Sequence, residues 1–273
     1  MEIRVIDDSI RKAVCEMGFA IPENIPTGNC FAQYREGKLV GAAYHDAGVF
    51  PEYDSIEIHI YVAEEWRRQG IGTEMYLRLI SVLDTAHFDI VSGCVWDDGK
   101  DDPALEFCRS LNAEPWQTLE YMEYSGSPFP EEIEMIPYSD EYYETLAAKK
   151  CEAWRKLAAV YGFKILPYSD RDRRLWQKDA ENTFVYMHNG IPSAMGSCGA
   201  DGHMHGLFVS PECKGQGLGR KIVMYCANRV FERGFKTASL SVLSKNPAKR
   251  IYSELGFVTV KSEHYFRFSK YNR

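Results

Sequence analysis

The chain has 273 residues, of which 45% are hydrophobic and 13% aromatic, so it can form one large or two ordinary domains with real cores. It contains no apolar run of about 18 residues or more, which excludes a conventional membrane-spanning helix. The N-terminus, MEIRVIDDSIRK, carries charges where a signal peptide needs an apolar core, and we therefore expect a soluble cytoplasmic protein.

Charge and cysteine usage narrow the class further. Residues 1–130 hold 10 Lys and Arg against 23 Asp and Glu, whereas residues 131–273 hold 22 against 16, which suggests two domains. The basic residues of the second half are dispersed, without a nucleic-acid-binding signature, so no nucleic-acid partner is expected. Eight cysteines without a CxxC pair favour reduced thiols over a zinc ribbon or a disulfide scaffold.

The first half reads as alternating strands and helices. Apolar periodicity and turn residues predict a strand at 2–6, a helix at 7–17 capped by Asp7 or Asp8, a hairpin over 31–34 and 39–44, a strand at 56–62 and a helix at 71–83. A helix started by a proline is then expected within DDPALEFCRSLNA, residues 101–113.

The second half repeats this order after SGSPFP, residues 125–130, which we interpret as the linker. The predicted elements are a strand at 133–136, a helical region at 140–161, a hairpin over 183–187 and 192–197 around Asn189-Gly190, a strand at 204–209, a helix at 218–233, a strand at 238–243, a helix at 247–255 and a last strand near 265–268. We therefore expect an N-terminal domain at 1–129 and a C-terminal domain at 130–273.

The most informative stretch is HMHGLFVSPECKGQGLGR, from His203 to Arg220. Pro211 stops the apolar strand, and the glycines after it permit a tight turn that points several N–H groups at one spot. Helical spacing starts at Leu218, so the turn lies at a helix N-terminus, where a phosphate is favoured. The spacing fits neither a Rossmann fingerprint nor a P-loop, and a tight turn without a ligand is the alternative.

The same stretch occurs in the first half at a spacing of 147 residues. Aligning the halves without a gap pairs Val62 with Val209, Arg67 with Lys214, Gly70 with Gly217 and Gly72 with Gly219. A period this long indicates duplicated domains rather than a solenoid. DDPALEFCRSLNA likewise parallels KNPAKRIYSELGF, residues 245–257.

These motifs resemble the GNAT superfamily of N-acetyltransferases. The order of strand, R/Q-x-x-G-x-G/A turn, helix and strand is followed by N-x-A-x-x-x-Y-x-x-L-G-F, which the second half carries as Asn246, Ala248, Tyr252, Leu255, Gly256 and Phe257. Lys214 departs from the usual Gln or Arg but still offers a positive charge. The resemblance implies an α/β (α+β) fold of two tandem GNAT-like domains, each with a mixed, mostly antiparallel sheet flanked by helices.

The resemblance also implies that acetyl-CoA binds with its pyrophosphate on the glycine turn and its pantetheine along the preceding strand. The implied cofactor-binding residues of the second half are Leu207, Phe208, Val209, Lys214, Gly215, Gln216, Gly217, Leu218, Gly219, Arg220 and Asn246. Those of the first half are Tyr61, Val62, Arg67, Arg68, Gln69, Gly70, Ile71, Gly72 and Thr73. Asn246 has a helix-capping role as its alternative.

Catalysis is expected from His203, His205 and Tyr252. The two histidines alternate along one strand and so share a face, which we expect to be that of Val209. The H-x-H spacing resembles serotonin N-acetyltransferase, which implies that the imidazoles take the ammonium proton of a primary amine and that Tyr252 protonates the leaving thiolate. The alternatives are hydrogen-bonded core histidines, a core tyrosine, and a metal site of His203, His205 and Cys198.

The first copy is expected to be catalytically degenerate. Its strand carries Ile56 and Ile58 at the positions aligned with the histidines, Cys108 stands where the second copy has Tyr252, and Glu57 and His59 point the other way unless a bulge reverses the strand. This copy is expected to bind acetyl-CoA or to pack against its partner.

We expect a tandem acetyltransferase that acts on a small-molecule or peptide amine in a ternary complex. The alternative is a non-catalytic acyl-CoA-binding or regulatory protein. Mere binding would not need the set of His203, His205 and Tyr252.

Overall fold

The computed structural model describes residues 2–23, 25–47, 55–83, 90–97, 103–130, 133–162 and 167–268. Contacts between Cα atoms divide the chain into two compact units. Unit 1 contains Met1–Val95, Asp101–Trp116 and His264–Arg273. Unit 2 contains Trp96–Lys100 and Gln117–Glu263. The units therefore do not follow the two halves of the sequence repeat, because residues 117–124 near the end of the first half belong to unit 2 and residues 264–273 at the end of the second half belong to unit 1.

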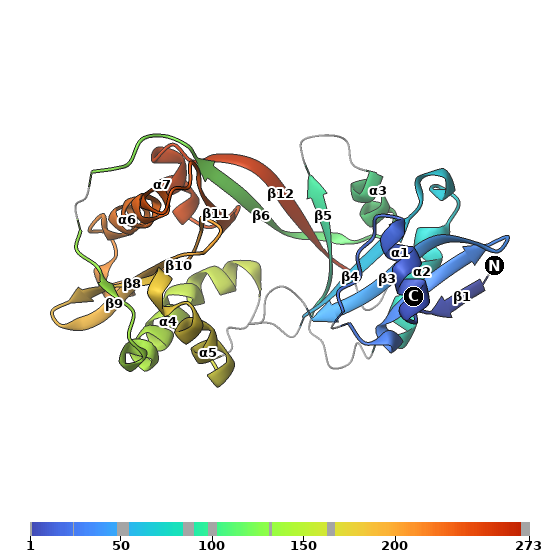
Figure 1. Ribbon diagram of the computed structural model, residues 1–273, viewed down its shortest axis with the longest axis horizontal. Helices are drawn as coiled ribbons and strands as arrows, with labels where there is room; N and C mark the ends of the chain where they lie inside the picture. Colours follow the sequence, from blue (N-terminus) through green and yellow to red (C-terminus); the bar gives the residue numbers. More distant parts are fainter. Residues whose placement is uncertain are drawn as a thin grey trace. The chain divides into compact units, whose positions relative to one another are not determined.

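Unit 1 is a mixed sheet with helices on both faces (Figure 1). Its strand order is β1-β2-β3-β4-β5 and then the end of β12; β4 and β5 are parallel, and β1 to β4 are antiparallel. Helices α2 and α3 pack on one face and α1 on the other. The elements are β1 (Glu2–Val5), α1 (Asp8–Glu16), β2 (Cys30–Arg35), β3 (Lys38–Ala47), β4 (Ser55–Val62), α2 (Ile71–Val82), β5 (Ile90–Asp97) and α3 (Pro103–Ser110).

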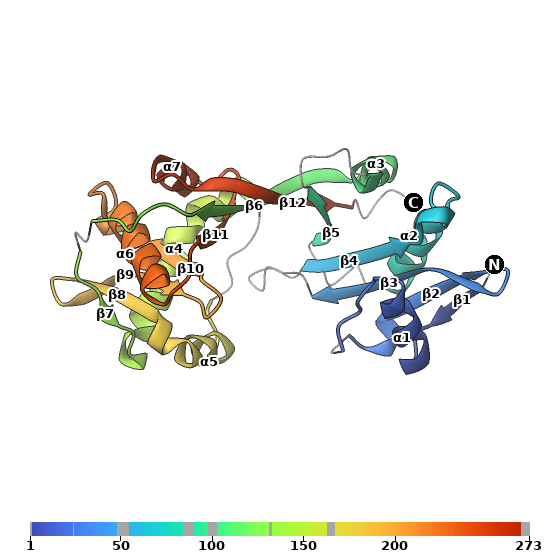
Figure 2. The same ribbon diagram turned by 45° about the horizontal axis from the view of Figure 1, so that its top comes forward.

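Unit 2 repeats this plan (Figure 2). Its strand order is β12-β6-β11-β10-β9-β8-β7, with β10 and β11 parallel. Helices α6 and α7 cover one face, and α4 and α5 cover the other. The elements are β6 (Glu114–Tyr124), β7 (Ile136–Pro137), α4 (Tyr143–Tyr161), α5 (Asp170–Lys178), β8 (Thr183–His188), β9 (Ile191–Cys198), β10 (His203–Val209), α6 (Leu218–Glu232), β11 (Ala238–Leu243), α7 (Ala248–Glu254) and β12 (Val258–Arg267).

The predicted fold class is confirmed, and most predicted elements lie within one or two residues of their expected bounds. Four differ: helix α5 is separate from the helical region expected at 140–161, β3 ends three residues after the expected Tyr44, the strand expected at 133–136 is the two-residue β7, and β12 begins seven residues before the expected Tyr265. Strand β6 is not among the predicted elements. The early part of β12 is exposed although it contains two valines: Val258 is 61% and Val260 46% exposed.

Segment 125–130, predicted to be a linker, packs on α6. Asn228, which is 5% exposed, accepts a hydrogen bond from the Phe129 amide and donates one to its carbonyl oxygen, both at 2.8 Å. The Phe129 ring stacks on Tyr124 at 4.6 Å. Because both the oxygen and the nitrogen of the buried Asn228 side chain bond to the Phe129 backbone, they hold this segment in one position on α6. The segment is therefore part of the unit 2 fold.

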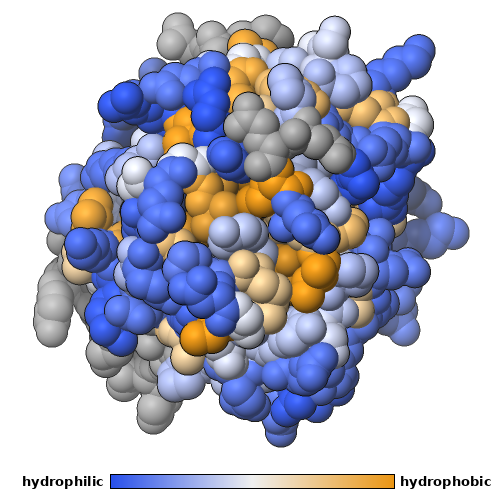
Figure 3. All heavy atoms as spheres, turned by 90° about the vertical axis from the view of Figure 1, so that its left-hand side faces the viewer, coloured by the Kyte–Doolittle hydropathy of each residue, from blue (hydrophilic) through white to orange (hydrophobic). Residues whose placement is uncertain are grey.

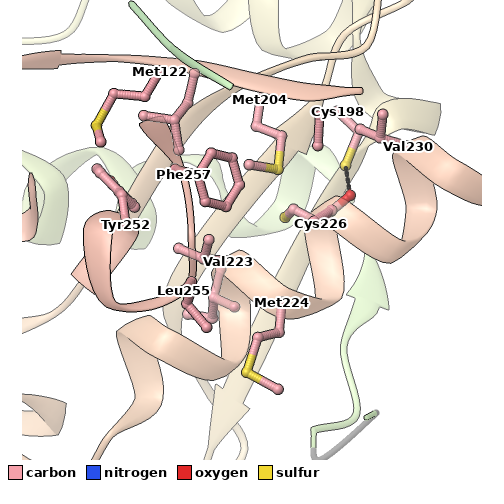
Figure 4. Close-up of a cluster of buried hydrophobic side chains, with 14 of the residues drawn as sticks. Met122, Cys198, Met204, Val223, Met224, Cys226, Val230, Tyr252, Leu255 and Phe257 are labelled. Atoms are coloured by element: carbon pink, nitrogen blue, oxygen red, sulfur yellow. Dashed lines mark hydrogen bonds between the residues drawn. The ribbon is translucent and has the colours of Figure 1, made fainter. Parts of the chain in front are cut away.

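The core of unit 2 lies between the sheet and helices α6 and α7. Figure 4 shows Met122 of β6 and Met204 of β10 facing Val223, Cys226 and other side chains of α6 and the α7 region. Cys198 donates its thiol hydrogen to the Cys226 carbonyl oxygen, with sulfur and oxygen 3.3 Å apart. The seven cysteines whose side chains are described are free thiols, as predicted; the side chain of Cys94 lies outside the described residues.

The end of β12 fills the core of unit 1. Phe266 and Phe268 are 5% and 7% exposed and cluster with Ile56, Ile58 and residues of α2. The ring of Phe268 lies 5.1 Å from that of Tyr76, and a Cβ on Gly93 would come within 3.0 Å of it. The rings of Phe266 and Phe268, near the C-terminus, therefore belong to the core of unit 1, which is built mainly from residues 1–95.

We predict that Phe266→Ala destabilises unit 1, because loss of a buried phenylalanine costs about 3–5 kcal/mol. Amide hydrogen exchange should show faster exchange in β2, β3 and β4 and little change in β8 and β9. The control is Val258→Ala, on the exposed part of the same strand, which should change neither. Equal loss of protection in both units, or none in unit 1, would contradict this assignment.

Candidate active site

The glycine turn of unit 2 has the geometry of an anion site. A 3₁₀ turn at Pro211–Cys213 is followed by the exposed Lys214, and Gly215 and Gly217 adopt φ values of +78° and +72°. Gly217 is the N-cap of α6 and offers no side-chain cap, so the first N–H groups of the helix are not capped by it. A Cβ on Gly215 or Gly217 would meet nothing within 4 Å, which leaves the space before the turn open to a ligand.

Gly219 differs from the two glycines before it. It lies inside α6 with an ordinary helical backbone, and a Cβ there would meet Ile251 at 3.6 Å and Val209 at 3.8 Å, both normal contacts. The exposed Arg220 follows it and pairs with Glu254 at 3.3 Å, and Leu218 is buried in the core. Within this turn, the backbone conformation favours glycine at positions 215 and 217 and not at position 219.

The corresponding turn of unit 1 is built in the same way with different side chains. It follows a 3₁₀ turn at Glu64–Trp66, Gly70 is the N-cap of α2 with φ of +80°, and Arg68 holds the left-handed conformation that Gly215 holds in unit 2. The expected cofactor residues of this copy include side chains with protein partners: Arg67 donates to the Val62 carbonyl oxygen at 3.1 Å, and Arg68 pairs with Glu106 at 3.1 Å.

The other expected cofactor residues of unit 1 flank this turn. Tyr61 donates its hydroxyl hydrogen to the Met17 carbonyl oxygen at 2.8 Å, whereas Gln69 is exposed. Ile71 is buried in the core at the start of α2. A Cβ on Gly72 would lie 3.1 Å from the ring of Phe107, and Thr73 follows in the first turn of the helix, partly buried.

In unit 2 the strand that leads into the turn separates from its parallel neighbour. Strands β10 and β11 are in register only at His203 with Ser239 and Met204 with Leu240. The antiparallel register between β10 and β9 shifts between His205 and Phe208, where Gly206 has φ of +66°. This β-bulge bends β10, so the segment 207–209 that continues to the turn borders an opening between two parallel strands.

The bulge also decides which face the histidines occupy. Val209 and Leu207 pack toward α6 with Met204, whereas Phe208 packs toward α4 with Met195. Because the bulge inserts one residue, His205 shares the Phe208 face. The histidines share a face with each other, as predicted, but the expectation that it is the face of Val209 is wrong. They lie on the α4 and α5 side of the sheet.

The two imidazoles have different surroundings. His203 is half-buried, with Nδ1 3.1 Å from the Ser239 hydroxyl and Nε2 3.2 Å from that of Ser241. Burial lowers the pKa of His203, so the ring is neutral at pH 7. His205 is 49% exposed at its side chain, and its Nε2 lies 3.2 Å from a carboxylate oxygen of Asp179. One ring is fixed by hydroxyls and the other is open to solvent beside a carboxylate.

Tyr252 lies on the other side of the sheet. It is 7% exposed in the core of α6 and α7, with its ring edge-on to Phe257 at 6.3 Å (Figure 4). Burial raises the pKa of Tyr252 to about 12, so the phenol keeps its proton at neutral pH. The sheet therefore separates the candidate base from the candidate acid.

Asn246 caps α7. Its side-chain oxygen accepts a hydrogen bond from the Ala248 amide at 3.0 Å, which is the structural role considered from the sequence. Cys198 does not join the histidines, since it is fully buried on the α6 face and donates a hydrogen bond to the Cys226 carbonyl oxygen. A metal site made of His203, His205 and Cys198 is therefore not assembled.

Helices α4 and α5 form the wall that faces the histidines. Lys149 of α4 donates to the Ser193 hydroxyl at 3.0 Å and to Glu212, next to the turn, at 2.5 Å. This hydrogen bond lowers the pKa of Glu212 to about 2. Arg173 of α5 pairs with Asp140 at 2.6 Å. Lys149 thus connects α4 to the residues before the turn, and Arg173 connects α5 to the segment that precedes α4.

Sequence reasoning missed Asp179, Ser239 and Ser241. Asp179 ends α5, a helix that was not separated in the sequence, so nothing placed it near β10. The two serines alternate along β11 in ASLSVL, and this period-2 spacing would have put them on one face. Their contact with His203 requires the parallel register of β10 and β11, which the sequence does not reveal.

A separate cavity of about 590 Å³ lies beside the turn. It is bounded by Ile133, Glu134 and Ile136, by Val185, Tyr186 and Met187 of β8, and by Gln216, Leu218 and Lys221 near the start of α6. None of its lining residues belongs to β10 or β11, so it is distinct from the opening between these strands. Figure 3 shows hydrophobic residues gathered on one face of unit 2, ringed by hydrophilic ones.

Two family models match the chain. Residues 9–112 match the acetyltransferase (GNAT) family, and residues 145–271 match the acetyltransferase (GNAT) domain. The chain belongs to the GNAT superfamily. It holds two GNAT domains in tandem, and this places it among the acyltransferases by fold and family.

Solved structures share this fold at low identity. A GCN5-related N-acetyltransferase from Sphaerobacter thermophilus has a TM-score of 0.67 at 17% identity, with 90% of this chain and 82% of that one covered. A GNAT-family acetyltransferase from Colwellia psychrerythraea has a TM-score of 0.61 at 15% identity, covering 98% and 100%. A tandem GNAT protein from the clavulanic acid biosynthesis pathway has a TM-score of 0.57 at 14% identity, covering 87% and 81%.

None of the curated proteins compared with this GNAT chain matches its sequence. At these identities the solved structures support the fold alone. Across the parts of the chain that the structure describes, no helix combines the length and apolarity that a membrane crossing needs.

We predict that Gly217→Glu abolishes acetyl-CoA binding to unit 2, because a residue with a side chain resists φ of +72° and a carboxylate repels pyrophosphate. Gly219→Ala is the matched control and should bind normally, since its Cβ makes only ordinary contacts. Calorimetric titration with acetyl-CoA distinguishes the two. Unchanged affinity and stoichiometry in a folded Gly217→Glu protein would contradict the assignment.

Proposed function

We propose that unit 2 of this GNAT protein transfers the acetyl group of acetyl-CoA to a primary amine by direct attack in a ternary complex. The observation that carries the proposal is the placement of His203 and His205 at the start of a strand whose far end forms the glycine turn. A base and an anion site on one strand, with an opening between them, suit a long donor whose phosphates and reactive end lie apart.

The residues of the turn fit the donor. Gly215 and Gly217 leave their N–H groups accessible, and Lys214, Arg220 and Lys221 add positive charge around them. Leu207, Phe208 and Val209 would line the bound pantetheine with backbone and apolar surface. When bound, acetyl-CoA supplies an acetyl group activated as a thioester.

The base would act from the α4 and α5 side. An ammonium group reaching His205 from solvent gives up its proton to the imidazole, and the Asp179 carboxylate 3.2 Å away pairs with the resulting imidazolium. His203 stays neutral and forms hydrogen bonds with Ser239 and Ser241, so it can accept a proton from a neighbouring hydroxyl or water. Both histidines would supply the base.

The acid would act from the α6 and α7 side. Tyr252 is protonated at neutral pH and buried, so it can deliver a proton without competition from solvent. Its proton would go to the sulfur that departs as the amide forms. Base and acid on opposite sides of the opening avoid direct neutralisation of one by the other.

The alternative is a non-catalytic acyl-CoA-binding protein. The hydrogen bonds of His203 to two serines suit a structural histidine, whereas His205 is exposed beside the partly buried Asp179 carboxylate, as a solvent-accessible base would be. Release of free thiol from acetyl-CoA and an amine panel separates the two functions. Because Cys15 is an exposed thiol, the protein without amine is the required blank.

We predict that replacing both histidines by Gln lowers the rate of thiol release at neutral pH by about 10²- to 10⁴-fold. Burial lowers the pKa of His203, so its base form is present at neutral pH and above; the loss should ease at high pH, where the amine deprotonates without help. His188→Gln, which removes an imidazole from β8, is the control. A double variant with the wild-type pH–rate profile would remove the histidines from the mechanism.

We predict that Tyr252→Phe slows the chemical step while acetyl-CoA affinity changes little, since the ring and its packing remain and only the transferable proton is lost. Single-turnover kinetics measure the step, and calorimetry measures the affinity. A full single-turnover rate in Tyr252→Phe would make this residue a core aromatic.

A further inference from the structure

The strand registers align the two units differently from the sequence. In unit 2, His203 and Met204 pair with Ser239 and Leu240 of β11; in unit 1, Glu57 and Ile58 pair with Ser92 and Gly93 of β5. Ile58 packs in the core beneath α2, as Met204 packs in the core beneath α6. The residue before each is therefore equivalent, although Glu57 lies five residues before Val62 and His203 six before Val209. The structural counterpart of His203 is Glu57.

The difference of one residue between the two strands comes from the β-bulge in β10. Strand β4 pairs with β3 without a shift from Ile56 to Val62, whereas β10 has one extra residue at Gly206. Val62 corresponds to Val209, and beyond the bulge His59 corresponds to His205. The comparison that set Ile56 and Ile58 against the histidines, and so made the first copy inert, is wrong. Those isoleucines face α2 in the core.

Glu57 and His59 lie on a polar and aromatic face of unit 1. Glu57 is 7% exposed, and its carboxylate lies 3.8 Å from Nε2 of His59. The His59 ring stacks on Tyr44 at 4.3 Å and 12°. Phe19 adds a further ring, 5.6 Å from Tyr44 and 5.4 Å from Tyr61.

Two carboxylates lie next to each other on this face. Asp46 of β3 lies directly opposite Glu57 in the register. Burial lowers the pKa of His59, so its ring is neutral at pH 7. Burial and then the charges of Glu57 and Asp46 raise the pKa of Tyr44 to about 12. Buried carboxylate next to aromatic ring faces is the environment that an ammonium group prefers.

From this register we propose that unit 1 carries a second amine-acceptor site, in which Glu57 takes the proton of a primary alkylammonium seated against Tyr44 and His59. Three features of one strand converge here: Glu57 at the position of His203, the end of parallel pairing with β5 at Ile58 and Gly93, and the turn with Gly70 at the start of α2. The donor chemistry rests on the function proposed for unit 2.

The step balances with the groups named. Glu57 accepts one proton from the ammonium, and the freed nitrogen lone pair forms the C–N bond to the acetyl carbon. The C–S bond breaks with its electron pair on sulfur, and the thiolate takes up the second proton lost by nitrogen, through water. Cys108 replaces Tyr252 here, so unit 1 lacks the phenol and should turn over more slowly than unit 2.

The first test is binding to the full chain in the presence of CoA, which cannot transfer an acetyl group. Butylamine and tyramine hydrochloride serve as probes, and the ring NMR signals of Tyr44 and His59 report on unit 1. Both signals should shift on titration, and Glu57→Gln should weaken the apparent affinity at least about 10-fold through the lost charge. Glu16→Gln, an exposed change of equal charge on α1, should leave it unchanged.

Unmoved Tyr44 and His59 signals, or equal affinities in Glu57→Gln and Glu16→Gln, overturn the proposal. If Glu57→Gln fails to fold, His59→Gln removes the stacked ring without a buried charge and should weaken binding in the same way. In this case an affinity equal to wild type overturns the proposal.

The second test is turnover in the His203→Gln/His205→Gln background. A residual thiol release that disappears on adding Glu57→Gln, and persists on adding Glu16→Gln, supports the second site. A residual rate insensitive to Glu57→Gln refutes it and leaves the function of unit 2 intact. Conversely, if the histidine changes have no effect but Glu57→Gln removes turnover, the function proposed for unit 2 fails and the unit 1 site stands.

Discussion

The bulge at Gly206 is the constraint on which the candidate site of unit 2 depends. A glycine with φ of +66° inserts one residue into β10, and the parallel pairing with β11 ends after two residue pairs. This φ disfavours any residue with a side chain, and a Cβ here would also lie 3.3 Å from the terminal methyl group of Met195. The bulge opens the strands and turns His203 and His205 toward α4 and α5.

The absence of a register shift in β4 is equally informative. Unit 1 reaches the same arrangement of turn, helix and separating strands without the extra residue, so its face toward α1 carries Glu57 and His59. Duplicated domains can thus diverge by a one-residue insertion in a strand. The insertion moves every residue that precedes it in the strand to the opposite face of the sheet. The terminal strands add a second departure from simple duplication, since Phe266 and Phe268 belong to the core of unit 1.

Much of the fold could be predicted from the sequence because its signals are local. The glycines that require positive φ, the Asn189-Gly190 hairpin and the cap of α1 by Asp7 were all read from neighbouring residues. The face of the histidines could not, because a bulge is a property of two paired strands and Gly206 alone does not specify it. The contact of His203 with Ser239, and the assignment of the end of β12 to unit 1, depend on pairing between segments far apart in the chain.

The central claim is that acetyl-CoA occupies the opening between β10 and β11 and the turn that follows it. Titration of isotope-labelled protein with acetyl-CoA, followed by backbone amide NMR, tests this claim most directly. The account predicts that the largest shifts in unit 2 occur at Leu207–Val209 and Gly215–Gly219 and extend to Ser241. Shifts confined to the separate cavity, at Val185–Met187 and 133–136, would contradict it.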